Sequence, residues 1–227
     1  MKKKIAVVFG GTGLTGSWLL KQIINDHFFE KIIVITRKKI ATKNLNITNK
    51  VIDFSKEKEI QDCIIKDAVV FSCIGTTQSQ VKGNKKRYKE IDFDITLNIA
   101  KASKKMNADK FLFISSGGAN SKSSNFYLKL KGEIEEAVIN IKNNSLFIIK
   151  PSLLIGRRKN RRFLEEIGQL IMPVFSFILP STIKAIKAKT VAKAMINLSK
   201  SNLSGKNIIE NSDLFNWSNS YYNQLLL

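Results

Sequence analysis

The sequence predicts an α/β protein with a doubly wound parallel sheet (a Rossmann fold) and a small C-terminal extension on the substrate side. Three observations support this prediction. Over residues 1–150, short apolar segments alternate with helix-like segments. The apolar segments lack polar alternation, which is typical of strands buried on both faces. A glycine-rich turn directly follows the first of them. Right-handed crossovers through the helices then place helices on both faces of the sheet.

The expected elements follow in regular order. Strands are expected at short runs of Ile, Val, Phe and Ala, and helices where apolar residues recur every three or four positions. The expected strands are residues 5–9, 31–35, 50–54, 68–73, 110–114 and 145–150, and the expected helices are residues 13–25, 57–65, 88–106, 125–141 and 190–199. We find no repeat, linker or second core. We therefore expect one domain over residues 1–227, in which residues 156–227 contribute the substrate-side cap.

The two longest expected helices show the clearest periodicity. In the first, the apolar positions are Ile91, Ile95, Leu97, Ile99 and Ala102. In the second, they are Phe126, Leu130, Ile134 and Val138. The second stripe fills one core-facing side of its helix, so Tyr127 and Lys131 are not needed as core residues. Either helix could pair with a second copy, and the sequence leaves monomer and homodimer open.

Composition limits the possible chemistry. With 44% hydrophobic residues and 14 Phe, the chain can build a sizeable core. No apolar segment is long enough to span a bilayer, and the run after Met1 is too short for a signal peptide. The two cysteines form no CxxC, which favours a reducing cytoplasm. The only histidine, His27, excludes a Ser-His-Asp triad and a His-based metal site, so no metal is expected.

The formal charge of +20 comes mainly from lysine. Only six of the 38 basic residues are arginine. Proteins that read phosphates or bases usually use more arginine, so we expect no specific nucleic-acid partner. A high positive charge still predicts non-specific attraction to polyanions at low salt.

The glycine-rich turn is the first candidate site. Gly10, Gly13 and Gly16 form a GxxGxxG pattern between the first strand and the first helix, and Thr12 and Leu14 lie within it. Glycine permits a tight turn and lets the backbone approach a pyrophosphate, while the helix N-terminus supplies free N–H groups. The order of strand, turn and helix predicts a dinucleotide site.

The end of the second strand indicates which dinucleotide binds. An NAD site expects Asp or Glu there, to accept hydrogen bonds from the ribose hydroxyls. This chain has Arg37 and Lys38 instead. A cation at this position suits a 2′-phosphate, and Arg37 is notable because arginine is scarce here. NADP(H) is therefore favoured over NAD(H).

A candidate acid–base pair follows the fifth strand. Ser116 lies at the strand end, and Tyr127 and Lys131 are four residues apart on the next helix, so their side chains share a face. A neighbouring ammonium and an oxidised nicotinamide would favour the ionised phenol, which could then move a proton to or from a carbonyl oxygen. Ser116 could hold the same oxygen through a hydrogen bond.

These motifs resemble the short-chain dehydrogenase/reductase superfamily. The likeness is closer to its atypical subgroup of Tat-interacting oxidoreductase-like proteins, and it covers residues 4 to 200. The shared stretches, besides the glycine turn and the Tyr-x-x-x-Lys pair, are residues 51–54 (VIDF), 73–77 (CIGTT), 115–119 (SSGGA), 123–126 (SSNF) and 131–133 (KGE). The resemblance implies a Rossmann fold that binds NADP(H).

The resemblance also implies roles for individual residues. Asp53 and Phe54 would lie near the adenine, Gly75 and Thr76 near the ribose, and Pro151 and Ser152 beside the nicotinamide amide. Lys131 would belong to the cofactor site as well as to the catalytic pair. Asn98 loosely matches a helix asparagine that supports the lysine in related enzymes, and Asp92 leaves this assignment open.

The basic run at residues 157–162 precedes an apolar stretch at residues 163–179. We interpret it as a solvated loop followed by a buried cap helix. The alternatives are recognition of an acidic substrate and peripheral contact with anionic lipid.

The sequence favours an NADPH-dependent carbonyl reductase, or the reverse alcohol dehydrogenase, with a small-molecule substrate. The alternatives are a non-catalytic NADP(H)-responsive regulator or scaffold and an epimerase that retains its nucleotide. The Ser-Tyr-Lys set favours an enzyme over a regulator, and the epimerase shares every motif.

Overall fold

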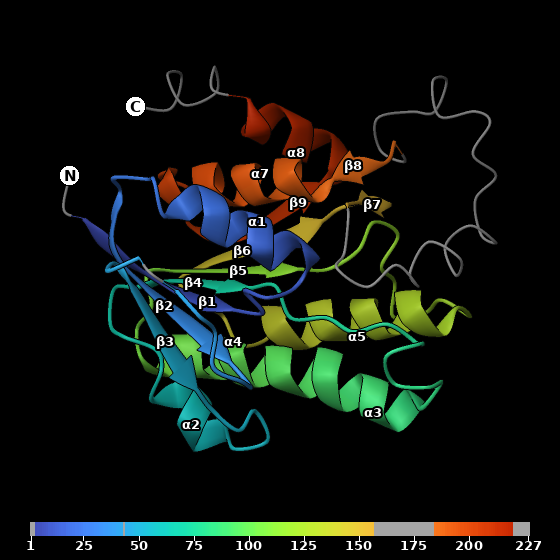
Figure 1. The fold of residues 1–227 in the computed structure, drawn as a ribbon. Helices are drawn as coiled ribbons and strands as arrows, with labels where there is room; N and C mark the ends of the chain where they lie inside the picture. Colours follow the sequence, from blue (N-terminus) through green and yellow to red (C-terminus); the bar gives the residue numbers. More distant parts are fainter. Residues whose placement is uncertain (1–2, 43, 157–183, 220–227) are drawn as a thin grey trace.

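The computed structural model describes residues 3–42, 44–156 and 184–219, and it confirms the predicted fold class. One parallel sheet has the strand order β3-β2-β1-β4-β5-β6-β9 (Figure 1). Its strands are β1 Lys4–Phe9, β2 Phe29–Thr36, β3 Ile47–Val51, β4 Val69–Ser72, β5 Lys110–Ile114, β6 Ser145–Lys150 and β9 Gly205–Glu210. A separate parallel pair joins β7 Leu154–Ile155 to β8 Ile186–Lys187.

Helices cover both faces of the sheet (Figure 1). One face carries α1 Leu14–Ile23, α7 Ala188–Lys200 and α8 Asn211–Ser218. The other carries α2 Glu57–Gln61, α3 Lys85–Lys89, α4 Ile95–Lys105 and α5 Phe126–Ile139. A π-helical turn, η1 Glu90–Asp94, lies between α3 and α4 and joins them into one helical segment.

The strands bury side chains on both faces, as their unbroken apolar runs predict. In β1, Val7 and Phe9 belong to the core between the sheet and α2–α5, whereas Ala6 and Val8 belong to the core beneath α1 and α7. All four residues are fully buried. Successive side chains of a strand point to opposite faces, so each strand contributes to both layers.

The strand order sets the position of a ligand crevice. From β1 the chain continues to β2 on one side and later returns to β4 on the other. The crossovers therefore diverge at the β1/β4 boundary, and a crevice opens outside the carboxyl ends of these two strands.

Several boundaries differ from the predicted ones. The strand expected at residues 50–54 is β3, and it ends at Val51 because its pairing partner β2 ends at Thr36. The helix expected at residues 57–65 ends at Gln61, after which the chain turns and buries Cys63 and Ile64. The helix expected at residues 88–106 begins earlier, at Lys85, and contains the π-helical turn.

The C-terminal part also contains elements that the sequence did not predict. Strand β9 pairs with β6 as the seventh strand, and α8 follows it. β9 lies at the edge of the sheet, with Ile208 43% exposed, so it lacks the apolar run that marks the inner strands. Residues 184–219 thus add a strand to the main sheet, whereas the predicted cap contained no strand of this sheet. The basic run 157–162 and the apolar stretch 163–179 lie outside the described residues.

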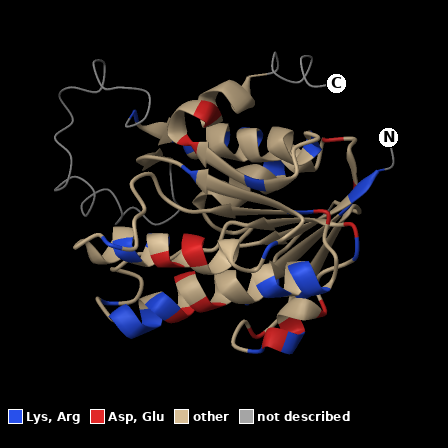
Figure 2. Cartoon of the chain, turned by 180° about the vertical axis from the view of Figure 1, so that it is seen from behind, with Lys and Arg blue, Asp and Glu red and all other residues tan. Residues whose placement is uncertain are grey.

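Charged residues are distributed over both helical layers. Figure 2 shows Lys and Arg positions on the helices of each face, together with Asp and Glu positions. Within residues 3–42, 44–156 and 184–219, no helix combines the length and apolarity that crossing a membrane requires.

Candidate functional site

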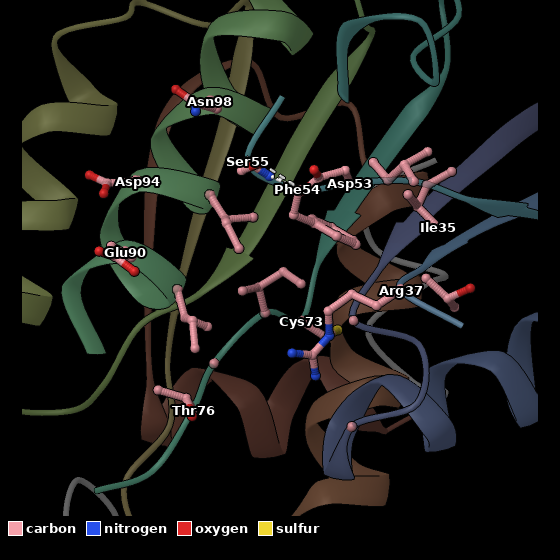
Figure 3. A pocket seen from close by; sticks show the side chains of 18 of the residues that line it. Ile35, Arg37, Asp53, Phe54, Ser55, Cys73, Thr76, Glu90, Asp94 and Asn98 are labelled. Atoms are coloured by element: carbon pink, nitrogen blue, oxygen red, sulfur yellow. Dashed lines mark hydrogen bonds between the residues drawn. The ribbon is translucent and has the colours of Figure 1, made fainter. Parts of the chain in front are cut away.

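A pocket of about 1090 Å³ opens at the carboxyl ends of β1, β2 and β4 (Figure 3). This volume lies just above the range of about 300–1,000 Å³ that is usual for ligand sites. The pocket brings together eight residues that the sequence assigned to the cofactor: Gly10, Thr12, Gly13, Arg37, Asp53, Phe54, Gly75 and Thr76. Residues from four separate segments of the chain therefore meet at the crevice that the topology predicts.

The glycine turn is shaped by close backbone contacts. Gly10 has a φ of +75°, and a Cβ atom there would lie 2.5 Å from the carbonyl oxygen of Cys73. A Cβ atom at Gly16 would lie 2.2 Å from the carbonyl oxygen of Gly10. Gly16 is thus needed to close the turn, although it does not line the pocket. These two glycines let the β1–α1 turn lie directly against the end of β4.

The N-terminus of α1 fits a phosphate group. Its N-cap residue, Gly13, has no side chain to accept from the helix, and the first turn contains no acidic residue. Thr12 and Gly13 line the pocket, so this uncapped end adjoins it. Free N–H groups and the positive end of the helix dipole favour an anion here. Leu14 has a packing role, since a Cβ atom at Gly156 would lie 2.6 Å from its Cδ1 atom.

The end of β2 contributes a cation to the pocket. In Figure 3 the Arg37 side chain extends from the strand end into the cavity. Lys38 is exposed and is not among the lining residues; its carbonyl oxygen accepts a hydrogen bond from Thr36 at 2.8 Å. Of the two predicted cations, the structure therefore places only Arg37 at the pocket.

Asp53 supplies a carboxylate near the expected adenine end. It accepts hydrogen bonds from the Ser55 N–H at 2.9 Å and from the Ser55 hydroxyl at 2.7 Å. The backbone hydrogen bond from Ser55, together with the hydroxyl, holds the pKa of Asp53 below its usual value. Asp53 is therefore ionised at neutral pH.

Tyr127 and Lys131 are brought together on α5. The helix begins at Phe126 because the Asn125 side chain caps it, accepting from the N–H groups of Tyr127 and Leu128 at 3.0 and 3.1 Å. The Lys131 ammonium lies 5.9 Å from the centre of the Tyr127 ring. The predicted i, i+4 arrangement is thus present in the folded chain.

Asp92, which the sequence left open, is the ionic partner of Lys131. Its Oδ2 atom lies 2.8 Å from the Lys131 Nζ, and both side chains are at most 7% exposed. Burial lowers the pKa of Lys131, but the charge and hydrogen bond of Asp92 outweigh it and the net shift is upward. Asn98, which loosely matches the helix asparagine that supports the lysine in related enzymes, lies on the pocket wall (Figure 3). The sequence did contain a signal for this ion pair, because Asp92 is an acid on the core-facing side of an expected helix. A buried charge normally has a partner of opposite charge.

The opposite oxygen of Asp92 reaches the cofactor pocket. Its Oδ1 atom accepts a hydrogen bond from the backbone N–H of Thr76 at 2.7 Å. Thr76 lines the pocket. One buried carboxylate therefore connects the pocket wall with the lysine of the acid–base pair.

The remaining predicted residues lie at the carboxyl ends of β5 and β6. The Ser116 hydroxyl donates to the carbonyl oxygen of Gly117 at 3.2 Å. The Gly117 N–H donates to the carbonyl oxygen of Pro151 at 2.8 Å, which joins the two loops. Ser152 is held by its N–H bond to Asn211 at 3.0 Å and by its hydroxyl bond to the Lys184 carbonyl at 2.6 Å. Neither Asn211 nor Lys184 was anticipated.

A second buried network lies beside the acid–base pair, also unanticipated. The Ser115 hydroxyl donates to the Glu135 carboxylate, whose other oxygen lies 3.3 Å from the Lys150 Nζ. Burial raises the pKa of Glu135, against the opposing effects of Ser115 and Lys150. This network ties α5 to the ends of β5 and β6.

A family profile identifies the chain. The profile described as "NAD dependent epimerase/dehydratase family" matches residues 6–160. The chain belongs to this family. Membership confirms the predicted likeness to NAD(P)-binding dehydrogenases, and it indicates a nicotinamide dinucleotide as the cofactor.

Relatives and solved structures agree with the family. Protein HTATIP2 of Rattus norvegicus is 31% identical over 203 residues, which cover 87% of this chain and 81% of that protein. The mitochondrial protein FMP52 of Candida glabrata is 34% identical over 163 residues, covering 70% and 68%. The fold is similar to UDP-N-acetylglucosamine 4-epimerase from Methanobrevibacter ruminantium M1, with a TM-score of 0.66, 21% identity and coverage of 92% and 77%. MoeE5 in complex with UDP-glucose and NAD has a TM-score of 0.68 at 14% identity, with coverage of 90% and 74%.

The predicted cytoplasmic location is contradicted by these family members. The FMP52 proteins of Candida glabrata, Scheffersomyces stipitis and Saccharomyces cerevisiae are mitochondrial. The prediction relied on two unpaired cysteines, and free thiols are compatible with more than one reducing compartment. Cysteine content was therefore too weak a signal for location.

The described residues contain no cluster of three or more His, Cys, Asp or Glu side chains that could hold a metal ion.

Proposed function

We propose that this family member is an NADP(H)-dependent oxidoreductase of the short-chain dehydrogenase type, acting on a carbonyl or alcohol substrate. The observation that carries the proposal is the Tyr127–Lys131 pair on α5, with the ammonium 5.9 Å from the ring centre. Asp92 connects this pair to Thr76 in the wall of the dinucleotide pocket. A nicotinamide site and an acid–base pair that share one edge of the sheet are what hydride transfer to a carbonyl requires.

The preference for NADP(H) rests on Arg37. It is the residue that follows β2, and it lines the pocket where NAD-specific sites present an acid. A guanidinium recognises phosphate by paired hydrogen bonds as well as by charge. The uncapped N-terminus of α1 would hold the pyrophosphate, and Asp53 and Phe54 would border the adenine.

The cofactor would supply or accept the hydride. The Tyr127 hydroxyl would exchange a proton with the substrate oxygen, which makes a carbonyl easier to reduce and an alcohol easier to oxidise. The Ser116 hydroxyl would turn from the Gly117 carbonyl to hold the same oxygen, as apo hydrogen bonds often rearrange in a complex. The buried Lys131 ammonium would stabilise the ionised form of Tyr127.

A second candidate is an epimerase that retains its nucleotide. The family description favours it, since the matching profile is that of epimerases and dehydratases. Such an enzyme oxidises and re-reduces one substrate, so its cofactor does not need to exchange. The absorbance of the purified protein tests this candidate: nucleotide that stays bound through gel filtration would favour the epimerase, and nucleotide-free protein would favour the reductase.

The main test is a titration of the full chain with NADPH and NADH at moderate salt. Arg37→Ala should weaken NADPH binding by roughly tenfold or more, the effect of losing one charge-assisted contact, and leave NADH within about twofold. Lys206→Ala is the control, because Lys206 is an exposed cation on β9, away from the pocket lining. Equal losses for both nucleotides would contradict the NADP preference, and no binding of either would overturn the enzyme assignment in favour of a partner-binding protein.

A further inference from the structure

We propose that Arg87, on α3, is a second phosphate-binding residue of the pocket and contacts the pyrophosphate from the side opposite the N-terminus of α1. Its present partner is Glu90, whose Oε2 atom accepts a hydrogen bond from the Arg87 Nη1 at 2.8 Å. The pyrophosphate would replace Glu90 when a dinucleotide binds. This inference rests on the proposed function, because it takes the pocket to be a dinucleotide site.

The distribution of basic residues indicates a site that selects guanidinium groups. Only six of the 38 basic residues are arginine, and four of these six lie within residues 157–162, outside the described residues. The other two, Arg37 and Arg87, both line the pocket, whereas none of the lining residues in the described part of the chain is lysine. A guanidinium recognises phosphate by paired hydrogen bonds in one plane, which an ammonium cannot do.

The helical segment formed by α3, η1 and α4 orders its residues along the pocket. Figure 3 shows Asn98 on the side of Asp53, and Glu90 closer to Thr76. Arg87 precedes Glu90 by about one helical turn and therefore lies further still from Asn98. Since Asp53 marks the expected adenine end, Arg87 lies towards the other end of the pocket.

That end of the pocket also adjoins the glycine turn. The Cys73 carbonyl oxygen, at the end of β4, lies against Gly10. Helices α1 and α3 cover opposite faces of the sheet (Figure 1). Thr12 and Gly13 line the pocket from the α1 side, and Arg87 lines it from the α3 side. The N–H groups of α1 and the guanidinium would thus contact a pyrophosphate from two sides.

The ion pair of Arg87 with Glu90 is suited to exchange. The two side chains are 58% and 40% exposed, so solvent and salt screen their attraction. A pyrophosphate offers the guanidinium more negative charge and a better match to its planar donors. Glu90 also lines the pocket, so its carboxylate repels an incoming phosphate as well as competing for Arg87. Glu90 should therefore lower the affinity for every ligand with a diphosphate group.

The experiment is a titration of the full chain with NADPH, NADH and ADP, which all carry a diphosphate. Arg87→Ala should weaken the binding of all three by about tenfold, the effect of losing one charge-assisted contact. Arg37→Ala should weaken only NADPH, because its proposed partner is the 2′-phosphate. Lys86→Ala is the matched control and should stay within about twofold, since Lys86 is an exposed cation on the same helix that does not line the pocket.

A second pair of variants tests the exchange. Glu90→Gln should tighten the binding of all three ligands by about threefold, because the guanidinium is released and one negative charge leaves the pocket. In the Arg87→Ala background the same substitution should have a smaller effect, since no guanidinium remains to be released. Equal effects of Glu90→Gln in both backgrounds would show that Glu90 does not compete for Arg87.

The remaining outcomes separate this inference from the proposed function. A loss confined to NADPH in Arg87→Ala would contradict the pyrophosphate contact, and a loss no larger than that of Lys86→Ala would reduce Arg87 to a general charge effect. Unchanged binding of both dinucleotides to Arg87→Ala would overturn the inference alone. If the natural chain binds ADP but neither dinucleotide, the proposed function fails and the ADP comparison still tests Arg87. If it binds none of the three, both fail.

Discussion

The α-carbon of Gly132 lies directly against the backbone of Ser121. A Cβ atom at residue 132 would be 2.1 Å from the Ser121 nitrogen and 2.3 Å from the Asn120 carbonyl carbon. Helix α5 therefore accepts the loop after β5 at a distance that no other residue type allows. This loop leads from Ser116 to the helix that carries Tyr127 and Lys131, so the contact fixes the separation of the three predicted catalytic residues.

Gly132→Ala should destabilise the protein by about 2–3 kcal/mol, because backbone atoms must move to admit the methyl group. The sign of the change in the free energy of unfolding is informative, since replacing glycine by alanine at an exposed helix position stabilises a protein by up to about 1 kcal/mol. Denaturant unfolding measures the change, and Lys129→Ala, on the exposed face of α5, should stay within about 0.5 kcal/mol of the natural chain. A stabilised Gly132→Ala protein would show that the loop does not lie on the helix.

Tyr127→Phe should abolish turnover and spare the cofactor site. The variant loses the hydroxyl that exchanges the proton, which predicts a fall in rate of about 10² to 10⁴ with whichever carbonyl compound screening identifies. The pocket lining contains neither Tyr127 nor its contacts with Asn125, so NADPH affinity should remain within about threefold. Stopped-flow reduction and fluorescence titration measure the two quantities. An active Tyr127→Phe protein would transfer the acid–base role to another group.

Glu135→Gln should flatten the pH dependence of stability. Burial raises the pKa of Glu135 in the folded protein, so its favourable contribution is complete below the unfolded value of about 4.3 and is lost as the pH rises through the folded value. Glutamine does not titrate and can still accept from Ser115. The free energy of unfolding of the variant, measured from pH 4 to 8, should therefore rise relative to the natural chain with increasing pH.

The control for this prediction is Glu133→Gln, the same substitution two residues earlier on α5. Its pH profile should run parallel to that of the natural chain. Parallel profiles for Glu135→Gln as well would mean that Lys150 compensates the burial of Glu135 completely.

The thiol of Cys73 should be unreactive in the native protein. Burial raises the pKa of Cys73 to about 12, and it also raises the pKa of Cys63. Since only the thiolate reacts, iodoacetamide at pH 8 should label both cysteines far more slowly in the folded chain than in guanidinium, where the pKa returns to about 8.5. Mass spectrometry of the two peptides measures the labelling. Rapid labelling of Cys73 in the native state would show that the thiol is open to solvent at the pocket.

The features that the sequence predicted correctly depend on neighbouring residues along the chain. The glycine turn, the cation at the end of β2 and the i, i+4 pair of Tyr127 and Lys131 all follow from local spacing. Buried parallel strands can also be recognised from the local sequence, because both of their faces are apolar. These signals were enough for the fold class and for eight of the residues that line the pocket.

The predictions that were incomplete concern contacts between distant segments. β9 is an edge strand with one face open, so its sequence lacks the apolar run of an inner strand. Lys38 resembles Arg37 in the sequence, and only the direction of the chain after β2 separates their positions.

By itself, the sequence determined the first six strands along the chain, the glycine turn after the first of them and the i, i+4 spacing of Tyr127 and Lys131, because each is set by side-chain type and short-range spacing. Only the tertiary structure decided that Asp92, and not Asn98, pairs with Lys131. That choice depends on which side of the helical segment faces α5, and the π-helical turn within it shifts this register. A buried lysine requires a counter-ion, but the packing of the helices selects which carboxylate provides it.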